Sequence, residues 1–433
     1  MYTWLLYFVP REDFLSLLGG YAILGLGYLW LCNFLSKEDD SFSQNVRWII
    51  APALLFRLIA VFAMPELSDD YFRFIWDGHL LVHGVNPFAS LPAEIWADPE
   101  LAHSYGLTEA LYNGLNSPEY FTIYPPVNQL IFYLAALLSP DSIYGAVMVM
   151  KAFVFAAEVG SLFLIWRLLE VWKLPLSRWS IYAFNPLVII ELCGNLHFEA
   201  LMIFFLLLFV WFAQKQKWMI SSVAFALSVA SKLLPLMLGP LLIKRFGWGK
   251  TIGFGVLMAI WLVLMFIPIL DEEMIAHMGE SIELYFQRFE FNASVYYVLR
   301  WIGFQYKGYN MIATFGKVLP MLVVGGILLI ALFEKNKSWP SFMKMAMWAF
   351  SLYLLMASIV HPWYLTTVLV FSLFTSFRYV MVWTLLVILS YSAYMSETYH
   401  EQLWLVAIEY VGVLSFLLWE SWKMLALAIL RKL

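Results

Sequence analysis

Apolar residues in this chain come in long unbroken runs, with short polar stretches between them. Such runs predict helices that lie in lipid, because membrane barrel strands would alternate apolar and polar positions over about ten residues. The runs fall near residues 14–35, 48–64, 142–166, 180–194, 197–213, 219–230, 233–243, 251–270, 311–333, 345–360, 362–377, 380–395 and 403–424. The pattern therefore predicts an all-α integral membrane protein, a polytopic bundle of about 13 transmembrane helices in which residues 1–433 form a single membrane domain.

Several of these runs are shorter than the ~20 residues that a helix needs to cross a bilayer. Short or broken helices at membrane depth are tolerated where they line a cavity or are buried in protein. The pattern therefore indicates a site within the membrane domain. No sequence repeat relates the two halves of the chain.

Composition supports the membrane interpretation. Hydrophobic residues make up 63% of the chain and charged residues 13%, whereas a soluble domain carries about 25% charged residues. Cys32 and Cys193 both lie in apolar runs, so neither a disulfide nor a zinc site is expected. The segment Met1–Pro10 lacks a basic leader and a cleavage site, so we expect no cleavable signal peptide. The net charge of −4 gives no sign of a nucleic-acid partner.

Short connections rich in Lys and Arg indicate the cytoplasmic side of a membrane protein. In this chain they contain Arg167, Lys173, Arg178, Lys215, Lys217, Lys244, Arg245, Lys250, Lys335, Lys337, Lys344, Arg378, Arg431 and Lys432. If all of these are cytoplasmic, two long loops, 65–126 and 271–310, lie outside. Shorter outer turns are then expected at 194–197, around Lys232, at 360–364 and at 396–402.

Segment 127–139 poses a problem of parity. The first outer loop and the Arg167 connection lie on opposite sides, so only one crossing fits between them. We therefore predict that 127–139, which Tyr124-Pro125-Pro126 introduces, is a short re-entrant or interfacial helix. The N-terminus is then outside and the C-terminus inside. A chain without a soluble domain suits a bacterial inner membrane, with its site facing the periplasm or the exterior.

The first outer loop carries a cluster of charged residues. Asp70, Arg73 and Asp77 recur at helical spacing, which predicts an amphipathic helix beside the membrane. Asp69 and Asp70 lie at its start, where the helix dipole favours negative charge. The alternative interpretation is an ordinary cap followed by a solvated helix face. The stretch Gly84–Phe88 is typical of a tight turn.

A second group of polar residues lies at the outer edge of two apolar runs. It consists of Glu191, Asn195, His197 and Glu199. Ionisable residues at membrane depth are costly and are usually functional or paired. A zinc site is the rival interpretation, but His197 and Glu199 are two residues apart and face differently on a helix. We therefore expect no metal ligand here.

Cationic residues on the outer side are candidates for binding an anion. Lys232 lies between two short helices and could neutralise a lipid phosphate or extend to the interface. His361 precedes Trp363 and Tyr364, which resemble interfacial anchors. Arg288 and Arg300 in the second outer loop are further candidates. Lys151 and Glu158, seven residues apart on one helix face, are interpreted as a structural pair.

A series of motifs resembles one enzyme family. The motifs are Asp69-Asp70-Tyr71, Gly84-Val85-Asn86-Pro87-Phe88, Tyr124-Pro125-Pro126, Ala183-Phe184-Asn185-Pro186-Leu187, Gly194-Asn195-Leu196-His197-Phe198-Glu199-Ala200, Ser231-Lys232-Leu233-Leu234-Pro235 and His361-Pro362-Trp363-Tyr364. In this order they resemble GT-C-type, polyprenol-phosphate-mannose-dependent mannosyltransferases. That group includes the enzyme that adds the first mannose to GPI anchors, and bacterial relatives that build α-mannans on lipid carriers. The resemblance covers most of the chain from about residue 65 to about residue 365.

The resemblance implies an inverting transfer of a sugar, mannose in that family, from a polyprenyl-phosphate donor to a lipid-linked or glycan acceptor at the outer membrane face. Asp70 best matches the general base, with Asp69 beside it. Residues expected to meet the donor phosphate are Lys232, Arg288, Arg300, His361 and Tyr364. Residues expected to meet the sugar or the acceptor are Arg73, Asp77, Tyr124, Asn195, His197 and Glu199.

The chain departs from the family pattern at two points. Asp69 and Asp70 are adjacent where the family often has Asp-x-Asp, so base and helper could be exchanged. His197-Phe198-Glu199 stands where an Asn-Asp or Ala-Asp pair is expected, and an extra helix precedes the first loop. No cofactor is required by the sequence, and a divalent cation, Mg²⁺ or Mn²⁺, is the only one considered.

Two other functions stay open at this point. A transporter or flippase also uses broken helices and charges at the midplane, but it should show a pseudo-repeat between its halves. A ligase on the same scaffold could transfer another sugar or a whole glycan. A nucleotide-sugar donor would call for a Rossmann-like domain, and the sequence predicts none.

Overall fold

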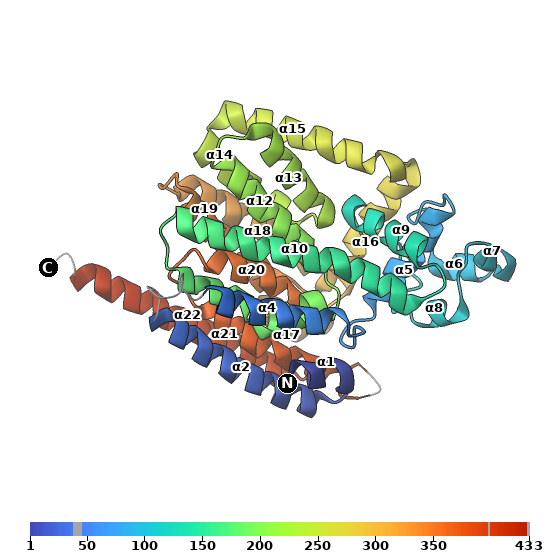
Figure 1. The fold of residues 1–433 in the computed structure, drawn as a ribbon, viewed down its shortest axis with the longest axis horizontal. Helices are drawn as coiled ribbons and strands as arrows, with labels where there is room; N and C mark the ends of the chain where they lie inside the picture. The colour runs from blue at the N-terminus through green and yellow to red at the C-terminus, as the bar shows by residue number, and fades with distance from the viewer. Residues whose placement is uncertain (38–45, 397–398, 431–433) are drawn as a thin grey trace.

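The computed structural model describes residues 1–37, 46–396 and 399–430. Within these ranges the chain is helical, and no β-strand forms; one isolated bridge joins Phe291 to Ile359. Most of the longer helices run lengthwise in the molecule (Figure 1). The predicted all-α class is confirmed.

Five helices of the described part are long and apolar enough to cross a membrane. They are α2 (Phe14–Lys37), α10 (Ile143–Val171), α15 (Trp248–Phe266, continued by the 3-10 turn Ile267–Ile269), α18 (Ile312–Phe333) and α22 (Leu403–Leu430). A sixth candidate is the bent pair of η2 (Val188–Gly194) and α12 (Glu199–Ala213), whose axes differ by 108°. The protein is therefore a membrane protein, but the expected count of about 13 spans is not confirmed.

The other apolar runs form shorter helices. They are α1 (Tyr2–Phe8), α4 (Val46–Val61), α9 (Pro126–Leu138), α11 (Trp179–Ala183), α13 (Trp218–Ser231), α14 (Gly239–Phe246), α19 (Trp339–Met356), α20 (Leu365–Ser372) and α21 (Tyr379–Leu386), with 3-10 helices η1 (Leu176–Arg178), η3 (Leu234–Leu238), η5 (Pro362–Tyr364) and η6 (Val387–Tyr394). Every residue of α20 is buried. As expected, short helices at membrane depth can be shielded by protein on all sides.

The first predicted outer loop folds into four helices. They are α5 (Asp70–Val82), α6 (Pro92–Trp96), α7 (Pro99–Ser104) and α8 (Glu109–Asn113). Asp98 and Thr108 cap α7 and α8 by accepting backbone N–H bonds. The predicted amphipathic character of α5 is not confirmed, because Arg73–Leu80 are all buried. The reason is that α5 packs against α9, α8 and α10.

The two predicted outer loops lie together at one end of the molecule. α16 (Glu272–Arg288) lies near α5 and α9, on the right in Figure 1, and α17 (Val295–Lys307) follows it along the chain. The side chain of Asn86 donates to the carbonyl of Ile269 at 3.0 Å and to Asp271. The ring of His277 stacks on Phe121 with centroids 3.7 Å apart. These contacts join the two loops.

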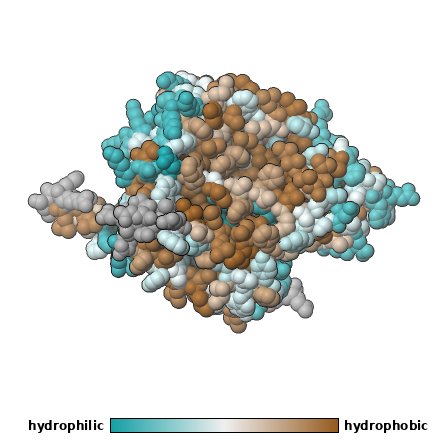
Figure 2. Space-filling model, viewed as in Figure 1, coloured by the Kyte–Doolittle hydropathy of each residue, from teal (hydrophilic) through white to brown (hydrophobic). Residues whose placement is uncertain are grey.

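Surface hydropathy follows the same axis. Figure 2 shows hydrophilic residues at both ends of the molecule and a broad hydrophobic band between them. The loop helices α5–α8 lie at one hydrophilic end, and the junction of α14 with α15, rich in Lys and Arg, lies toward the other (Figure 1). This arrangement agrees with the predicted opposition of loop and basic connections, while the absolute orientation stays a prediction.

Single cysteines test that orientation. Ser104→Cys on α7 and Glu280→Cys on α16 should react with an impermeant maleimide on intact cells, because both positions are exposed at the outer end. Asn336→Cys, exposed between α18 and α19, should react only after permeabilisation. The native Cys32 and Cys193 are buried, so the unsubstituted protein gives the background. Labelling with the opposite pattern would invert the topology.

Candidate active site at the break in a membrane span

Local sequence interrupts the helices at both ends of η2, before it at Asn185-Pro186 and after it at the bend into α12. Pro186 has no N–H to give, and the side chain of Asn185 accepts the N–H of Leu187 at 3.0 Å, which starts a new segment. Val188–Gly194 form π-helical turns, a geometry that is frequent at functional sites. Leu196 then adopts a φ of 61°, which is uncommon for a residue other than glycine. The break leaves backbone groups without helical partners inside a buried region.

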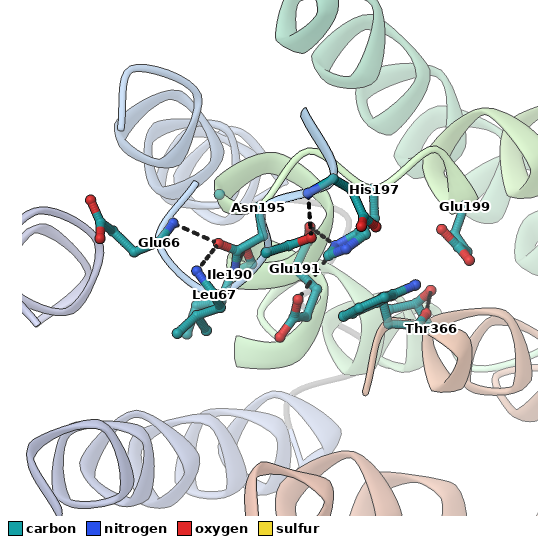
Figure 3. Close-up of polar contacts among 12 residues, drawn as sticks. Glu66, Leu67, Ile190, Glu191, Asn195, His197, Glu199 and Thr366 are labelled. Atoms are coloured by element: carbon teal, nitrogen blue, oxygen red, sulfur yellow. Dashed lines mark hydrogen bonds and ion pairs between the residues drawn. The ribbon is translucent and has the colours of Figure 1, made fainter. Parts of the chain in front are cut away.

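Asn195 joins this break to the first outer loop. Its side-chain oxygen accepts the N–H groups of Glu66 at 3.2 Å and Leu67 at 3.0 Å, and its Nδ2 donates to the carbonyl of Ile190 at 3.1 Å (Figure 3). The predicted contact with substrate stays untested. The amide oxygen is already committed to the loop that leads into Asp69 and Asp70.

Lys151 makes the second connection. Its buried Nζ donates to the carbonyls of Ala60 at 3.2 Å, Gly194 at 2.6 Å and Ala63. This one side chain on α10 therefore holds both the end of α4 and the break.

The predicted pair of Lys151 with Glu158 is wrong. Glu158 instead accepts from Arg57 Nε at 2.9 Å and from the Tyr182 hydroxyl at 2.6 Å. Seven residues along a helix correspond to about 10.5 Å, so these side chains share a face but reach different partners.

Asp69 and Asp70 differ in their surroundings, although they are adjacent. α5 begins at Asp70, and Asp69 occupies the N-cap position without capping the helix by its side chain. Asp69 instead forms an ion pair with Arg11 at 2.8 Å. The half-buried carboxylate of Asp70 accepts from Asn116 Nδ2 at 3.1 Å.

The pKa of Asp70 is raised above its ordinary value. Burial is the largest cause, and the negative charges of Asp69 and Glu199 add to it. Hydrogen bonds from Asn116 and Ser68 act in the opposite direction. Asp70 therefore holds a proton more tightly than an exposed aspartate does, which suits a group that must accept one.

Arg73 and Asp77, which the sequence placed on one helix face, form an ion pair with each other. Arg73 Nε lies 2.8 Å from Asp77 Oδ1, and its Nη1 donates to the carbonyl of Tyr120 at 2.8 Å. The other oxygen of Asp77 accepts from Thr122 and from Gln129 Nε2, the latter at 2.9 Å. These bonds fasten the segment before α9 to α5. Contact of either residue with substrate stays a prediction.

Tyr124 lies at the same junction. Its ring makes edge-on contacts with Phe74 at 4.9 Å and Phe132 at 5.5 Å between centroids. It is half-buried and lies within electrostatic reach of both Asp70 and Glu199. Tyr124 is therefore a residue expected to meet the sugar that lies near both carboxylates.

Lys232 lies between α13 and η3, as expected. Its Nζ forms an ion pair with Glu199 and sits 3.9 Å above the centroid of the Tyr364 ring. Glu199 is the first residue of α12, where the helix dipole favours its negative charge. The ammonium group of Lys232 therefore faces protein partners, and the interpretation that it extends to the interface is not supported.

His197 belongs to a stack of rings. Its centroid lies 3.7 Å from that of Trp363, which in turn lies 4.4 Å from that of His361. His197 Nδ1 is 2.8 Å from the backbone oxygen of Glu191, so the proton is on Nδ1. Glu191 accepts the hydroxyl of Tyr391 at 2.6 Å.

The group Glu191, Asn195, His197 and Glu199 is thus divided among separate partners. Figure 3 shows Glu191 and His197 together, with Glu199 apart from them and Asn195 directed toward the outer loop. The expected difference in facing between His197 and Glu199 is confirmed.

The second outer loop contains two of the residues that were predicted to bind phosphate, Arg288 and Arg300. Arg300 on α17 forms an ion pair with Glu290 and lies 4.3 Å over the ring of Tyr297. Arg288 is the last residue of α16, and its side chain lies outside the described part of the structure. Binding of phosphate by either stays a prediction.

Arg11 and Asn116 are site residues that the sequence interpretation missed. Arg11 pairs with Asp69 and also lies 4.7 Å over the ring of Tyr394. It is the sole basic residue before Lys37, which is a signal that could have marked it. Asn116 carries no such signal.

The described residues do not form a metal site made of protein side chains alone. Among them, no group of three or more His, Cys, Asp or Glu side chains is arranged to hold an ion. Mg²⁺ often binds one or two carboxylates together with substrate phosphates. The divalent cation therefore stays a prediction.

Comparison with known proteins points to one family. A family model described as alpha-(1->6)-mannopyranosyltransferase, N-terminal domain, matches residues 11–245, more than half of the chain. No individual curated protein matches the chain. The matched region includes Arg11, the start of α5, the broken span and Lys232.

Lys151→Met tests the connection between α10 and the break. Methionine keeps the length of the side chain but removes its donors, leaving the carbonyls of Ala63 and Gly194 without this partner at roughly 1–3 kcal/mol per buried group. The carbonyl of Ala60 keeps the N–H of Ala63 as a donor. We expect a clear fall in the melting temperature of the purified protein in detergent, followed by tryptophan fluorescence. Lys337→Met, at an exposed position, is the matched control. Equal melting temperatures would show that Lys151 does not support the break.

Proposed function

Since the chain belongs to the alpha-(1->6)-mannopyranosyltransferase family, which confirms the mannosyltransferase resemblance, we propose an inverting transfer of mannose from a polyprenyl-phosphate donor to a lipid-linked or glycan acceptor at the outer membrane face. One observation carries the proposal: the half-buried Asp70, with its raised pKa, lies within electrostatic reach of Glu199, which holds Lys232. Glu199 thus links the proposed proton acceptor to the proposed phosphate-binding cation.

An apolar cavity lined mainly by α18 and α19 supports a lipid-linked donor. It has a volume of about 190 Å³ and is lined by Met237, Tyr296, Gly316, Leu319, Pro320, Val323, Val324, Ile327, Tyr353, Met356, Ala357 and Ser358. Met237 lies five residues after Lys232, and Tyr353 is within electrostatic reach of Glu199. A polyprenyl chain in this cavity would bring its phosphate toward Lys232.

Lys232 would stabilise the leaving phosphate. An ammonium group has three donors, and the ion pair with Glu199 uses one of them. A remaining N–H can bind the phosphate as its charge grows in the transition state. His361 and Tyr364 lie beside this position, with ring centroids 5.4 Å apart.

Asp70 would act as the general base. The acceptor hydroxyl oxygen attacks the anomeric carbon, its proton passes to Asp70, and the bond from that carbon to the phosphate oxygen breaks with the electron pair leaving on the phosphate. One displacement inverts the anomeric configuration and needs no covalent sugar–enzyme intermediate. If the product is α-linked, as the family name states, the donor is β-linked. Asp69 forms an ion pair with Arg11. It would assist the reaction only through its position beside Asp70.

Family membership also separates the enzyme from its rivals. A transporter or flippase has no need of a base beside a cation, and the matched family is named for mannosyl transfer. The same name disfavours a ligase for another sugar.

Asp70→Asn should lower transfer by about a hundredfold or more, because asparagine cannot take the proton. Asp69→Asn should cost less, since it removes only a partly exposed ion pair. Transfer from radiolabelled polyprenyl-phosphate mannose by purified protein measures both. An active Asp70→Asn enzyme beside an inactive Asp69→Asn enzyme would transfer the role to Asp69.

The pH profile of kcat/KM gives the control for that assignment. The base works when deprotonated, so activity falls as pH drops through its pKa, and the raised pKa of Asp70 places this fall above the range of an ordinary aspartate. Glu199→Gln removes one cause of the raised pKa and should move the fall to lower pH. An unmoved acid limb would mean that another group accepts the proton.

Lys232→Met should weaken use of the donor. Loss of a charge-assisted bond to phosphate costs roughly 1.5–3 kcal/mol, about tenfold or more in kcat/KM for the donor. Lys307→Met, exposed on α17, is the control. Normal donor kinetics in a well-expressed Lys232→Met enzyme would remove the lysine from phosphate recognition.

A further inference from the structure

Three aromatic rings form a cluster on the outer side of the broken span. Centroid distances are 6.0 Å between Tyr394 and Tyr399, 6.3 Å between Phe291 and Tyr394, and 6.4 Å between Phe291 and Tyr399. Phe291 is fixed by a bridge in which its N–H donates to Ser358 at 2.9 Å and its carbonyl accepts from Val360 at 2.8 Å. Tyr399 is 53% exposed, so the cluster has an accessible face.

One edge of this aromatic cluster adjoins the proposed base. Arg11 lies 4.7 Å over the ring of Tyr394 and pairs with Asp69, the neighbour of Asp70. Asp70 is also within electrostatic reach of Tyr394. Phe291 stacks on His361 with centroids 5.0 Å apart. The rings therefore lie next to both the base and the imidazole beside Lys232.

The other edge carries two half-buried carboxylates. Glu401 accepts the N–H of Asn292 at 2.6 Å and the hydroxyl of Tyr297. Glu290 accepts the hydroxyl of Tyr296 at 2.7 Å and pairs with Arg300. The Tyr399 hydroxyl reaches the backbone oxygen of Glu290 at only 3.5 Å. Asn310 also donates to Glu290 at 3.3 Å, and the Tyr399 side chain hydrogen-bonds to Glu401. Ionised carboxylates have about four acceptor positions, so each retains room for a further donor.

Rings with carboxylates at their edge suit an uncharged polyhydroxy ligand. The C–H face of a sugar packs on an aromatic ring, and its hydroxyl groups donate to carboxylate oxygens. The local charges include four carboxylates, Asp69, Asp70, Glu290 and Glu401, against two cations, Arg11 and Arg300. This balance disfavours a phosphate or an anionic lipid headgroup.

We infer that this cluster, with Tyr394 and Tyr399 as its platform and Glu290 and Glu401 at its edge, is a subsite for the acceptor glycan. The inference rests on the proposed function in one respect, namely that the bound sugar is the acceptor of the transfer. The donor enters beside Lys232, whereas the attacking hydroxyl must reach Asp70, and the cluster leads to Asp70 through Arg11 and Asp69. A glycan lying on Tyr399 and Tyr394 presents its end to the base.

Tyr399→Ala and Tyr399→Phe test the platform. Saturation-transfer NMR with free α-(1→6)-linked manno-oligosaccharide and purified protein measures binding without any turnover. Alanine should weaken binding about tenfold, equivalent to ~1.4 kcal/mol, and phenylalanine should bind normally because the ring remains. Tyr309→Ala, 58% exposed beyond the end of α17, is the matched control.

Transfer kinetics give the second measurement. The acceptor KM should rise about tenfold in Tyr399→Ala while the donor KM stays unchanged. Equal binding by Tyr399→Ala and the unsubstituted protein, or an altered donor KM alone, would overturn the subsite. Oligosaccharide binding that depends on the Tyr399 ring, in a protein without mannosyl transfer, would support the subsite and refute the proposed function.

Discussion

Backbone carbonyl groups in an apolar environment need hydrogen-bond donors, and the break between η2 and α12 leaves such groups in a fully buried region. Lys151 supplies three donors to carbonyls at the break and at the end of α4. Asn195 bonds the loop backbone at Glu66 and Leu67. Because Asn195 holds Glu66 and Leu67 against the break, these bonds also fix the segment that leads into the start of α5. The position of Asp70 therefore depends on polar contacts that an unbroken helix would not require.

Charge pairing then sets Asp70 apart from its neighbours. Arg11 pairs with Asp69, Arg73 with Asp77, Lys232 with Glu199 and Arg300 with Glu290. Asp70 is held by the amide of Asn116 instead. An amide stabilises a carboxylate less than a cation does, and the nearby charges of Asp69 and Glu199 disfavour its ionised form. The pairs at the surface add little stability, but they fix where each charge lies.

Much of this arrangement followed from local sequence. Apolar runs predicted the helices, helical spacing placed Arg73 and Asp77 on one helix face, and flanking short helices predicted the place of Lys232. The number of spans did not follow, because a run of apolar residues has the same composition whether it faces lipid or, like α20, protein. The partners of Lys151 are backbone carbonyls, which carry no sequence signal. Arg11, Glu290 and Glu401 come together only through packing between distant segments.

The two proposed substrate sites bear on the stereochemistry of transfer. In the proposed arrangement, a donor lying in the apolar cavity would direct its phosphate toward Lys232, and an acceptor on the platform of Tyr394 and Tyr399 would approach past Arg11. Asp70 lies within electrostatic reach of Glu199, the partner of Lys232, and of Tyr394. In a single displacement the nucleophile and the leaving group occupy opposite sides of the anomeric carbon. Separate entry of lipid donor and glycan acceptor, with one carboxylate between them, is the arrangement that such an inverting transfer needs.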